Sequence, residues 1–173
     1  RTVDIGKIMA TCGYDWLFID MEHNSMGIDI ASQISVAAQD AGITPIVRVP
    51  DFAHHHATRV LDCGAMGVVF PHVDNAEIAK KLVSYCLYPP KGHRSMTGVL
   101  PQLDFKQKPI ADVASTINEN MLIVNDMLIL TENKNIKKII LDDLIDGIES
   151  DLKKEVNFTT VKELLIYSYR VAG

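Results

Sequence analysis

The sequence predicts an α/β protein in which parallel strands alternate with helices. Short apolar runs, typical of strands buried on both faces, recur between residues 15 and 70. Stretches with the apolar spacing of helices separate these runs, and the connections are short. Because parallel strands are joined by right-handed crossover connections, this alternation indicates the α/β class.

Three strands and two helices are expected in the first part of the chain. Gly13 and a downstream polar cluster bound the first strand. Gly42 stops the helix that follows, and Pro50 prevents an easy helical continuation of the second strand. The expected strands cover residues 15–20, 43–49 and 66–70, and the expected helices cover residues 27–41 and 54–63.

A capping box is expected at the start of the next helix. Asp74 is the predicted N-cap residue, with Glu77 reaching back to it, and the helix should run to about Leu87. Pro89 and Pro90 then end it. The remaining expected elements are a helix at residues 110–118, a strand at 121–130 that Asn125-Asp126 interrupts, and helices at 135–144 and 160–172.

Composition bears on the classes of partner. A net charge of -5, with no Lys/Arg run longer than a pair, predicts no nucleic-acid partner. No stretch approaches the roughly 20 uninterrupted apolar residues that span a bilayer, so no membrane association is expected. The three cysteines are far apart within apolar segments, which predicts buried thiols, a reducing compartment and a cytoplasmic location.

Polar side chains follow each of the first three predicted strands. Asp20, Glu22 and His23 follow the first, Arg48 ends the second, and His72 follows the third. In parallel α/β proteins reactive groups gather at the carboxyl ends of the strands. These residues therefore form a candidate acid–base site, although a solvated polar loop is the alternative explanation for the first group.

Several of these residues have a structural alternative. An arginine at position 48 is costly to bury unless it meets an anion, which is either an acidic ligand or a protein carboxylate such as Asp20 or Glu22. Asp62 is either a polar group at a helix C-terminus or a catalytic orienting residue. Adjacent helical residues point about 100° apart, so the run 54–56 of three histidines is not expected to bind one metal ion.

Five ordered motifs resemble the HpcH/HpaI family of metal-dependent 2-oxo acid and 4-hydroxy-2-oxo acid aldolases. They are Gly13-Tyr-Asp-Trp-Leu-Phe-Ile-Asp-Met-Glu-His23, Pro45-Ile-Val-Arg-Val-Pro50, Leu61-Asp-Cys-Gly-Ala65, Pro71-His-Val73 and Tyr88-Pro-Pro-Lys-Gly-His-Arg-Ser95. The resemblance implies a TIM-type (β/α) barrel. Because such a barrel typically needs about 250 residues, the chain is expected to be an incomplete copy, with residues 1–173 forming a single partial domain.

The family resemblance also implies a reaction. A divalent ion, Mg or Mn, would chelate a pyruvate-like 2-oxo acid and stabilise its enolate during carbon–carbon cleavage. By resemblance, Arg48 would bind the oxo group, and His23 would be the general acid or base, held by Asp20 or Asp62. The catalytic set is then His23, Arg48, Asp20 and Asp62, the substrate-binding set is Arg48, Pro71 and His72, and a homo-oligomer is expected.

The expected metal ligands depart from the family pattern. Leu130 occupies the position of a glutamate in an Ile-Glu-Thr-Glu context, and leucine cannot bind a hard cation. Glu132 and Asp126 are nearby carboxylates, and Asp151 is the best match to the second ligand. The leading hypothesis is a lyase that cleaves or forms a 4-hydroxy-2-oxo acid, and the alternative is a non-catalytic homologue without the metal site.

Overall fold

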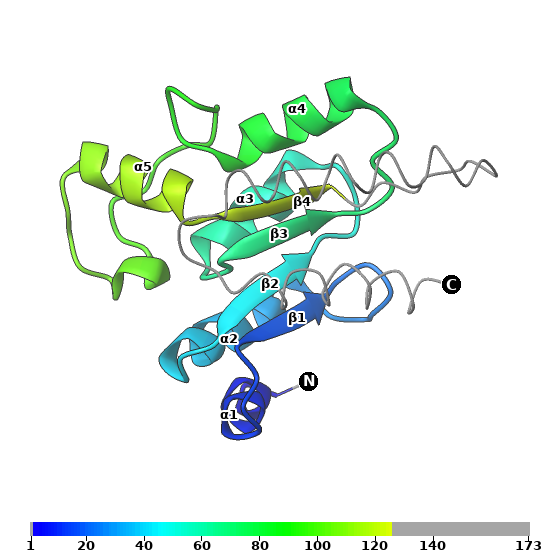
Figure 1. Ribbon diagram of the computed structural model, residues 1–173, viewed down its shortest axis with the longest axis vertical. Helices are drawn as coiled ribbons and strands as arrows, with labels where there is room; N and C mark the ends of the chain where they lie inside the picture. Colours follow the sequence, from blue (N-terminus) through cyan, green and yellow to red (C-terminus); the bar gives the residue numbers. More distant parts are fainter. Residues whose placement is uncertain (1, 126–173) are drawn as a thin grey trace. The chain divides into compact units, whose positions relative to one another are not determined.

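The computed structural model describes residues 2–125 of the chain, and they form a parallel sheet with helices (Figure 1). The strands are β1 (Trp16–Asp20), β2 (Thr44–Arg48), β3 (Gly67–Phe70) and β4 (Leu122–Asn125). The helices are α1 (Asp4–Thr11), α2 (Ile28–Asp40), α3 (His54–Asp62), α4 (Ala76–Cys86), the 3₁₀ turn η1 (Pro101–Leu103) and α5 (Ile110–Glu119).

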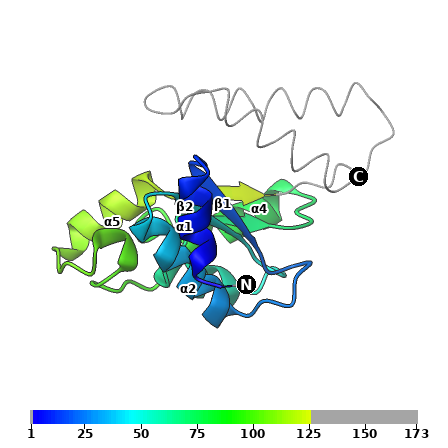
Figure 2. The same cartoon turned by 90° about the horizontal axis from the view of Figure 1, so that it is seen from below.

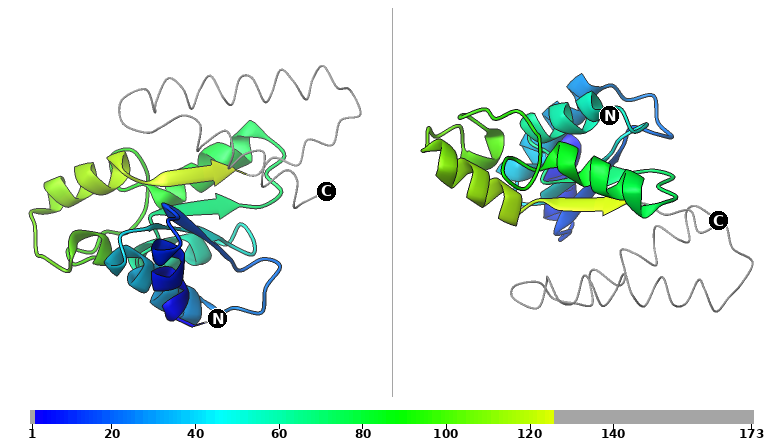
Figure 3. Two further views of the ribbon diagram at one scale, coloured as in Figure 1. Left: turned by 60° about the horizontal axis from the view of Figure 1, so that its bottom comes forward. Right: turned by 90° about the horizontal axis from the view of Figure 1, so that it is seen from above.

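The four strands lie in chain order across the sheet, β1-β2-β3-β4, and all three pairings are parallel. Every crossover therefore steps in the same direction, and right-handed connections place the intervening helices on one face. The views of Figure 3 show the green helix α4 lying along one face of the yellow strand β4. This winding is that of a (β/α) barrel, whose complete form has eight strands.

The main core lies between the sheet and these helices. Ile19, Val47 and Val68 are in register on neighbouring strands, and all three are buried. They face apolar residues of α2, α3 and α4, which include Ala31, Ile34, Ala38, Ala57, Val60, Leu61, Leu82 and Cys86. The alternation of side chains along each strand leaves the other face of the sheet for Asp20, Arg48 and their neighbours.

Glycine permits two close backbone approaches in this unit. A Cβ atom on Gly67 would lie 3.0 Å from Cβ of Leu122, so β3 and β4 pair closely here. A Cβ atom on Gly6 would lie 2.8 Å from Cα of Ala38, where α1 packs against α2 (Figure 2). Small residues at both positions therefore set the distance between neighbouring elements.

The structure confirms the predicted order of strands and α-helices over residues 15–125, with a correction at the start of α4 and an additional helix before residue 15. Asn75, not Asp74, is the N-cap of α4, because its Oδ1 accepts the backbone N–H of Ile78 at 2.8 Å. Asp74 instead accepts a hydrogen bond from the Asn75 side chain. Helix α1 was not predicted at all.

The later predictions reach past the described residues. The strand expected at residues 121–130 is present as β4 up to Asn125, and its second half lies outside the described part. The helices expected at 135–144 and 160–172 also lie outside it, and the single domain over residues 1–173 stays a prediction.

The expectations about membrane-spanning segments and cysteine burial can be tested on residues 2–125. No helix in this part of the chain is long and apolar enough to cross a membrane. The prediction that all three cysteines are buried is wrong, since Cys86 is buried, Cys63 is partly exposed and Cys12 is exposed. Cys12 is the C-cap residue of α1.

We expect Gly6→Ala to destabilise the fold by about 1–3 kcal/mol, because the added methyl group meets the backbone of Ala38 and pushes α1 away from α2. Urea denaturation measures the change in free energy of unfolding. Gly98→Ala is the matched control, because nothing lies within 4 Å of its added Cβ atom, and it should change stability by less than about 0.5 kcal/mol. Equal effects of the two substitutions would contradict the close approach of α1 and α2.

Candidate active site

An ion pair joins the carboxyl ends of β1 and β2. Asp20 and Arg48 are the last residues of their strands and are paired in the parallel register, so their side chains emerge on the same face. Nε of Arg48 donates to Oδ1 of Asp20 at 2.9 Å, and Nη2 donates to Oδ2 at 2.7 Å. The guanidinium also lies 5.7 Å from the ring centroid of Phe18, two residues back along β1.

Glu22 is the second carboxylate on Arg48. Its Oε2 lies 3.1 Å from Nη1 of Arg48, so each of the three guanidinium nitrogens faces a carboxylate oxygen. The sequence left open whether Arg48 meets a protein carboxylate or an acidic ligand. The structure contains the protein ion pair, with both carboxylates, while 18% of the Arg48 side chain stays exposed.

His72 joins this cluster from the end of β3. Its Nε2 lies 2.8 Å from Oε1 of Glu22, and its side chain is 62% exposed. Its backbone has a φ of 56°, in the left-handed region that few residues other than glycine adopt. Pro71, the other residue expected to contact substrate, directly follows β3 and is buried.

His23 lies at the exposed rim of the cluster. Its side chain is 70% exposed, and its Nε2 is 3.6 Å from Oε1 of Glu22, too far for a hydrogen bond. Asp20 was expected to hold the imidazole, but its Oδ1 accepts the backbone N–H groups of Glu22 at 3.0 Å and His23 at 3.4 Å. Asp20 thus shapes the loop that carries His23 and does not contact the ring.

The environment of Asp20 favours its ionised form. Burial raises the pKa of its carboxyl group. Several contacts lower this pKa, and together they outweigh burial. They are the hydrogen bonds from Arg48 and from the backbone N–H groups of Glu22 and His23, and the positive charge of Arg48. The net result is a pKa below the ordinary value of 3.8.

Asp62 lies apart from this cluster. It is the last residue of α3, which runs back toward the start of β3. Asp62 therefore lies at the end of the sheet where the strands begin, and Arg48 lies at the end where they finish. Its Oδ1 accepts hydrogen bonds from Nη2 of Arg94 at 2.6 Å and from Nε at 3.2 Å. Within one copy of the chain, Asp62 therefore partners Arg94 and not the imidazole of His23.

Arg94 is the most buried charged side chain of this second group. It is 2% exposed, stacks 4.6 Å from the ring centroid of Tyr88, and donates to the carbonyl of Cys86 at 3.4 Å. Burial raises the pKa of the Cys86 thiol to about 12, although the charge of Arg94 lowers it. This thiol is therefore an apolar core group and not a nucleophile.

The described residues do not by themselves provide a metal centre. Residues 2–125 contain no group of three or more histidine, cysteine, aspartate or glutamate side chains placed to hold an ion. Asp20 and Glu22 already face Arg48. Leu130 and the expected ligands Glu132 and Asp151, like Asp126, lie outside the described residues.

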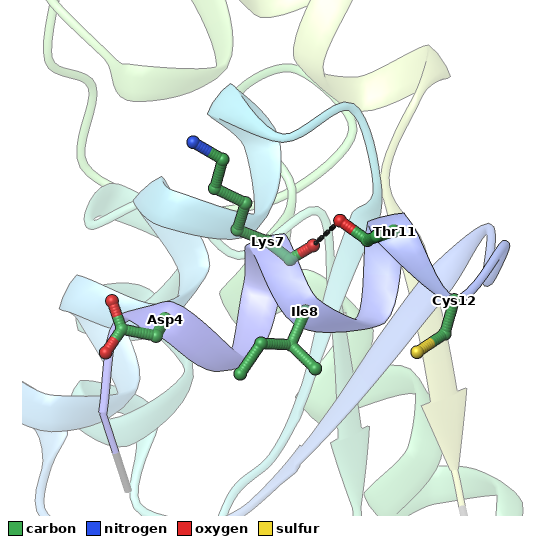
Figure 4. A pocket seen from close by; sticks show the side chains of 5 residues that line it. All are labelled: Asp4, Lys7, Ile8, Thr11 and Cys12. Atoms are coloured by element: carbon green, nitrogen blue, oxygen red, sulfur yellow. Dashed lines mark hydrogen bonds between the residues drawn. The ribbon is translucent and has the colours of Figure 1, made fainter.

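Two hollows in the described surface lie away from the cluster. One, of about 350 Å³, is lined by five residues of α1 and its cap (Figure 4). The other, of about 520 Å³, includes Asp62 and Cys63 beside the C-terminal part of α2. Neither hollow is lined by a residue of the Arg48 cluster, and neither brings together groups with an evident acid–base or metal-binding role.

We expect Asp20→Asn to lower the free energy of unfolding by about 1–3 kcal/mol at neutral pH, since it removes a charged partner of Arg48. Because folding depresses the pKa of Asp20, the wild-type advantage is present above pH 3.8 and disappears as the pH falls through the lower folded-state pKa. Urea denaturation at a series of pH values measures this loss.

The matched control is Asp104→Asn, because Asp104 pairs with Lys106 on the surface, where the two side chains are 80% and 72% exposed. It should change stability by less than about 1 kcal/mol. A difference between Asp20→Asn and wild type that is the same in acid and at neutral pH would contradict the stabilisation of the Asp20 carboxylate.

Comparison with curated proteins identifies several aldolases. The chain is 38% identical over 122 residues to the 4-hydroxy-4-methyl-2-oxoglutarate aldolase tasA of Hapsidospora irregularis, covering 68% of this chain and 45% of that protein. It is 32% identical over 148 residues to the 2-keto-3-deoxy-L-rhamnonate aldolase of Escherichia coli, covering 85% and 55%. The chain thus spans about half the length of the curated relatives it matches.

Solved structures give the same picture. The HpcH/HpaI aldolase from Desulfitobacterium hafniense DCB-2 is similar with a TM-score of 0.71 and 27% identity, over 98% of this chain and 69% of that one. The citrate synthase SbnG is similar with a TM-score of 0.62 and 30% identity, over 71% and 46%. These likenesses confirm the prediction of a partial TIM-type fold. The HpcH/HpaI aldolase/citrate lyase family matches residues 2–149, and the chain belongs to this family.

Proposed function

We propose that this chain carries part of a carbon–carbon lyase site that cleaves or forms a 4-hydroxy-2-oxo acid, with pyruvate or a related 2-oxo acid as product. The observation that supports this proposal most is Arg48, a guanidinium fixed at all three nitrogens and still partly exposed. A fixed cation of this kind stabilises charge that develops on an oxygen in a transition state.

The relatives favour a 2-oxo acid as the substrate class. The Hapsidospora and Escherichia proteins are both named after a 2-oxo acid substrate. It is a 2-oxoglutarate derivative in the first name and a 2-keto sugar acid in the second. The matching protein of Sagittula stellata is a hydroxypyruvate/pyruvate aldolase, 29% identical over 147 residues. The shared chemical feature is a carbonyl group beside a carboxylate, and the rest of the molecule differs.

The proposed cleavage uses His23 and Arg48. His23, directly or through water, takes the proton of the 4-hydroxyl group, the C3–C4 bond breaks, and its electron pair passes into the 2-oxo group as an enolate. The charge of Arg48 stabilises the oxygen that becomes negative. Return of a proton to C3 then gives the 2-oxo acid, with an aldehyde or ketone as the second product. We propose that Pro71 and His72, which follow β3, contact the substrate.

The family is generally dependent on a divalent metal ion. When bound, such an ion polarises the carbonyl and carboxylate oxygens of the 2-oxo acid. We propose Glu132 and Asp151 as its ligands in this chain, with Mg or Mn as the ion. Leu130, at the expected glutamate position, motivates the competing hypothesis of a non-catalytic homologue that binds no metal.

We expect purified protein supplied with Mg or Mn to release pyruvate from 4-hydroxy-4-methyl-2-oxoglutarate, and Arg48→Ala to lower kcat by about 10²–10³-fold. A coupled pyruvate assay measures the rate, and elemental analysis measures bound metal. Arg59→Ala is the matched control, because Arg59 is an exposed arginine on α3, and it should leave the rate unchanged. Absence of both bound metal and pyruvate would favour the non-catalytic homologue.

A further inference from the structure

We infer that Glu22 is a positioning residue that fixes the imidazole of His72 with Nε2–H toward the protein and Nδ1 toward the ligand. The identity of the ligand, a 2-oxo acid, rests on the proposed function. The contact between Glu22 and His72 does not depend on it. The sequence placed Glu22 in the candidate acid–base site because it follows β1, but it did not indicate His72 as its partner.

The burial of Glu22 is the first part of the argument. Its side chain is only 10% exposed, although residues 23–25, which follow it, are exposed. A carboxylate so far withdrawn from water needs charged or hydrogen-bonding partners. It has them on both oxygens, since Oε2 faces Arg48 at 3.1 Å and Oε1 faces His72 at 2.8 Å.

The chemistry of the carboxylate decides which nitrogen of His72 carries a proton. An ionised carboxylate only accepts hydrogen bonds, so at 2.8 Å the Nε2 of His72 must be the donor. In the neutral imidazole the other nitrogen, Nδ1, then holds the lone pair. Glu22 thereby selects the tautomer in which Nδ1 accepts a proton, or donates one once the ring is protonated.

The backbone of His72 supports a functional orientation. Its φ of 56° is unfavourable for a residue with a side chain, and such positions persist where the surrounding structure requires them. The imidazole still exposes 62% of its surface, so it can meet a ligand while one nitrogen stays bonded. His23, at 3.6 Å from the same oxygen, is not fixed in this way.

Nitrogen-15 NMR of the imidazole rings tests the inference without any need for catalysis. In the wild-type protein, His72 should give the pattern of a single tautomer protonated at Nε2. In Glu22→Ala, the two ring-nitrogen shifts should move toward each other as the ring is released. His72→Asn assigns the signals by removing them.

His93 serves as an internal reference, because its Nδ1 is bonded to Ser84 at 2.9 Å at the end of α4, and its signals should not move. If Glu22→Ala fails to fold, Glu22→Asp keeps a carboxylate near Arg48 but shortens its reach, and it should release His72 in the same way. An Nδ1–H tautomer in the wild type, or unchanged His72 signals in the folded variant, would overturn the inference.

Kinetics provide a second measurement where pyruvate release is detected. Glu22→Asp should lower kcat/KM by about 10-fold, because it releases His72, which is proposed on the substrate side of the site. An unchanged kcat/KM would contradict the positioning role. Loss of the single tautomer in an inactive protein would leave the inference standing and count against the proposed lyase reaction alone.

Discussion

The parallel register between β1 and β2 is the constraint on which the candidate site depends. It pairs Asp20 with Arg48 at the last residue of each strand, so a carboxylate and a guanidinium emerge side by side. The ion pair neutralises two charges that would be costly to bury separately, and it fixes the guanidinium plane. Glu22 and His72 then attach to this pair from the neighbouring loops.

A second ion pair, between Arg94 and Asp62, lies at the opposite end of the strands and has a structural role. Arg94 is almost fully buried against Tyr88, and its bond to Asp62 ties the segment after α4 to the end of α3. Gly92 permits this arrangement, because a Cβ atom there would meet the carbonyl oxygens of Leu87 and Ser84. In this pair the arginine is buried while 38% of the Asp62 side chain is exposed, whereas Arg48 and Asp20 are both partly exposed, at 18% and 24%.

The fold was largely predictable over residues 15–125, because apolar runs and glycine or proline stops are local signals. Helix α1 was missed, although Ile5 and Met9 have helical spacing and pack on the core. The N-cap error arose because Asp74 and Asn75 are adjacent capping residues, and sequence alone does not choose between them. The partnership of Asp62 with Arg94 spans 32 residues and depends on tertiary packing.

The charge of the Arg48 cluster bears on what it can bind. Asp20 and Glu22 contribute two formal negative charges against the one positive charge of Arg48. An anionic 2-oxo acid approaching these described residues alone meets an excess of negative charge, which opposes binding. A divalent cation would reverse that balance and let the fixed guanidinium act on the oxo group. The general dependence of the family on a divalent metal ion fits this negative balance of the described residues.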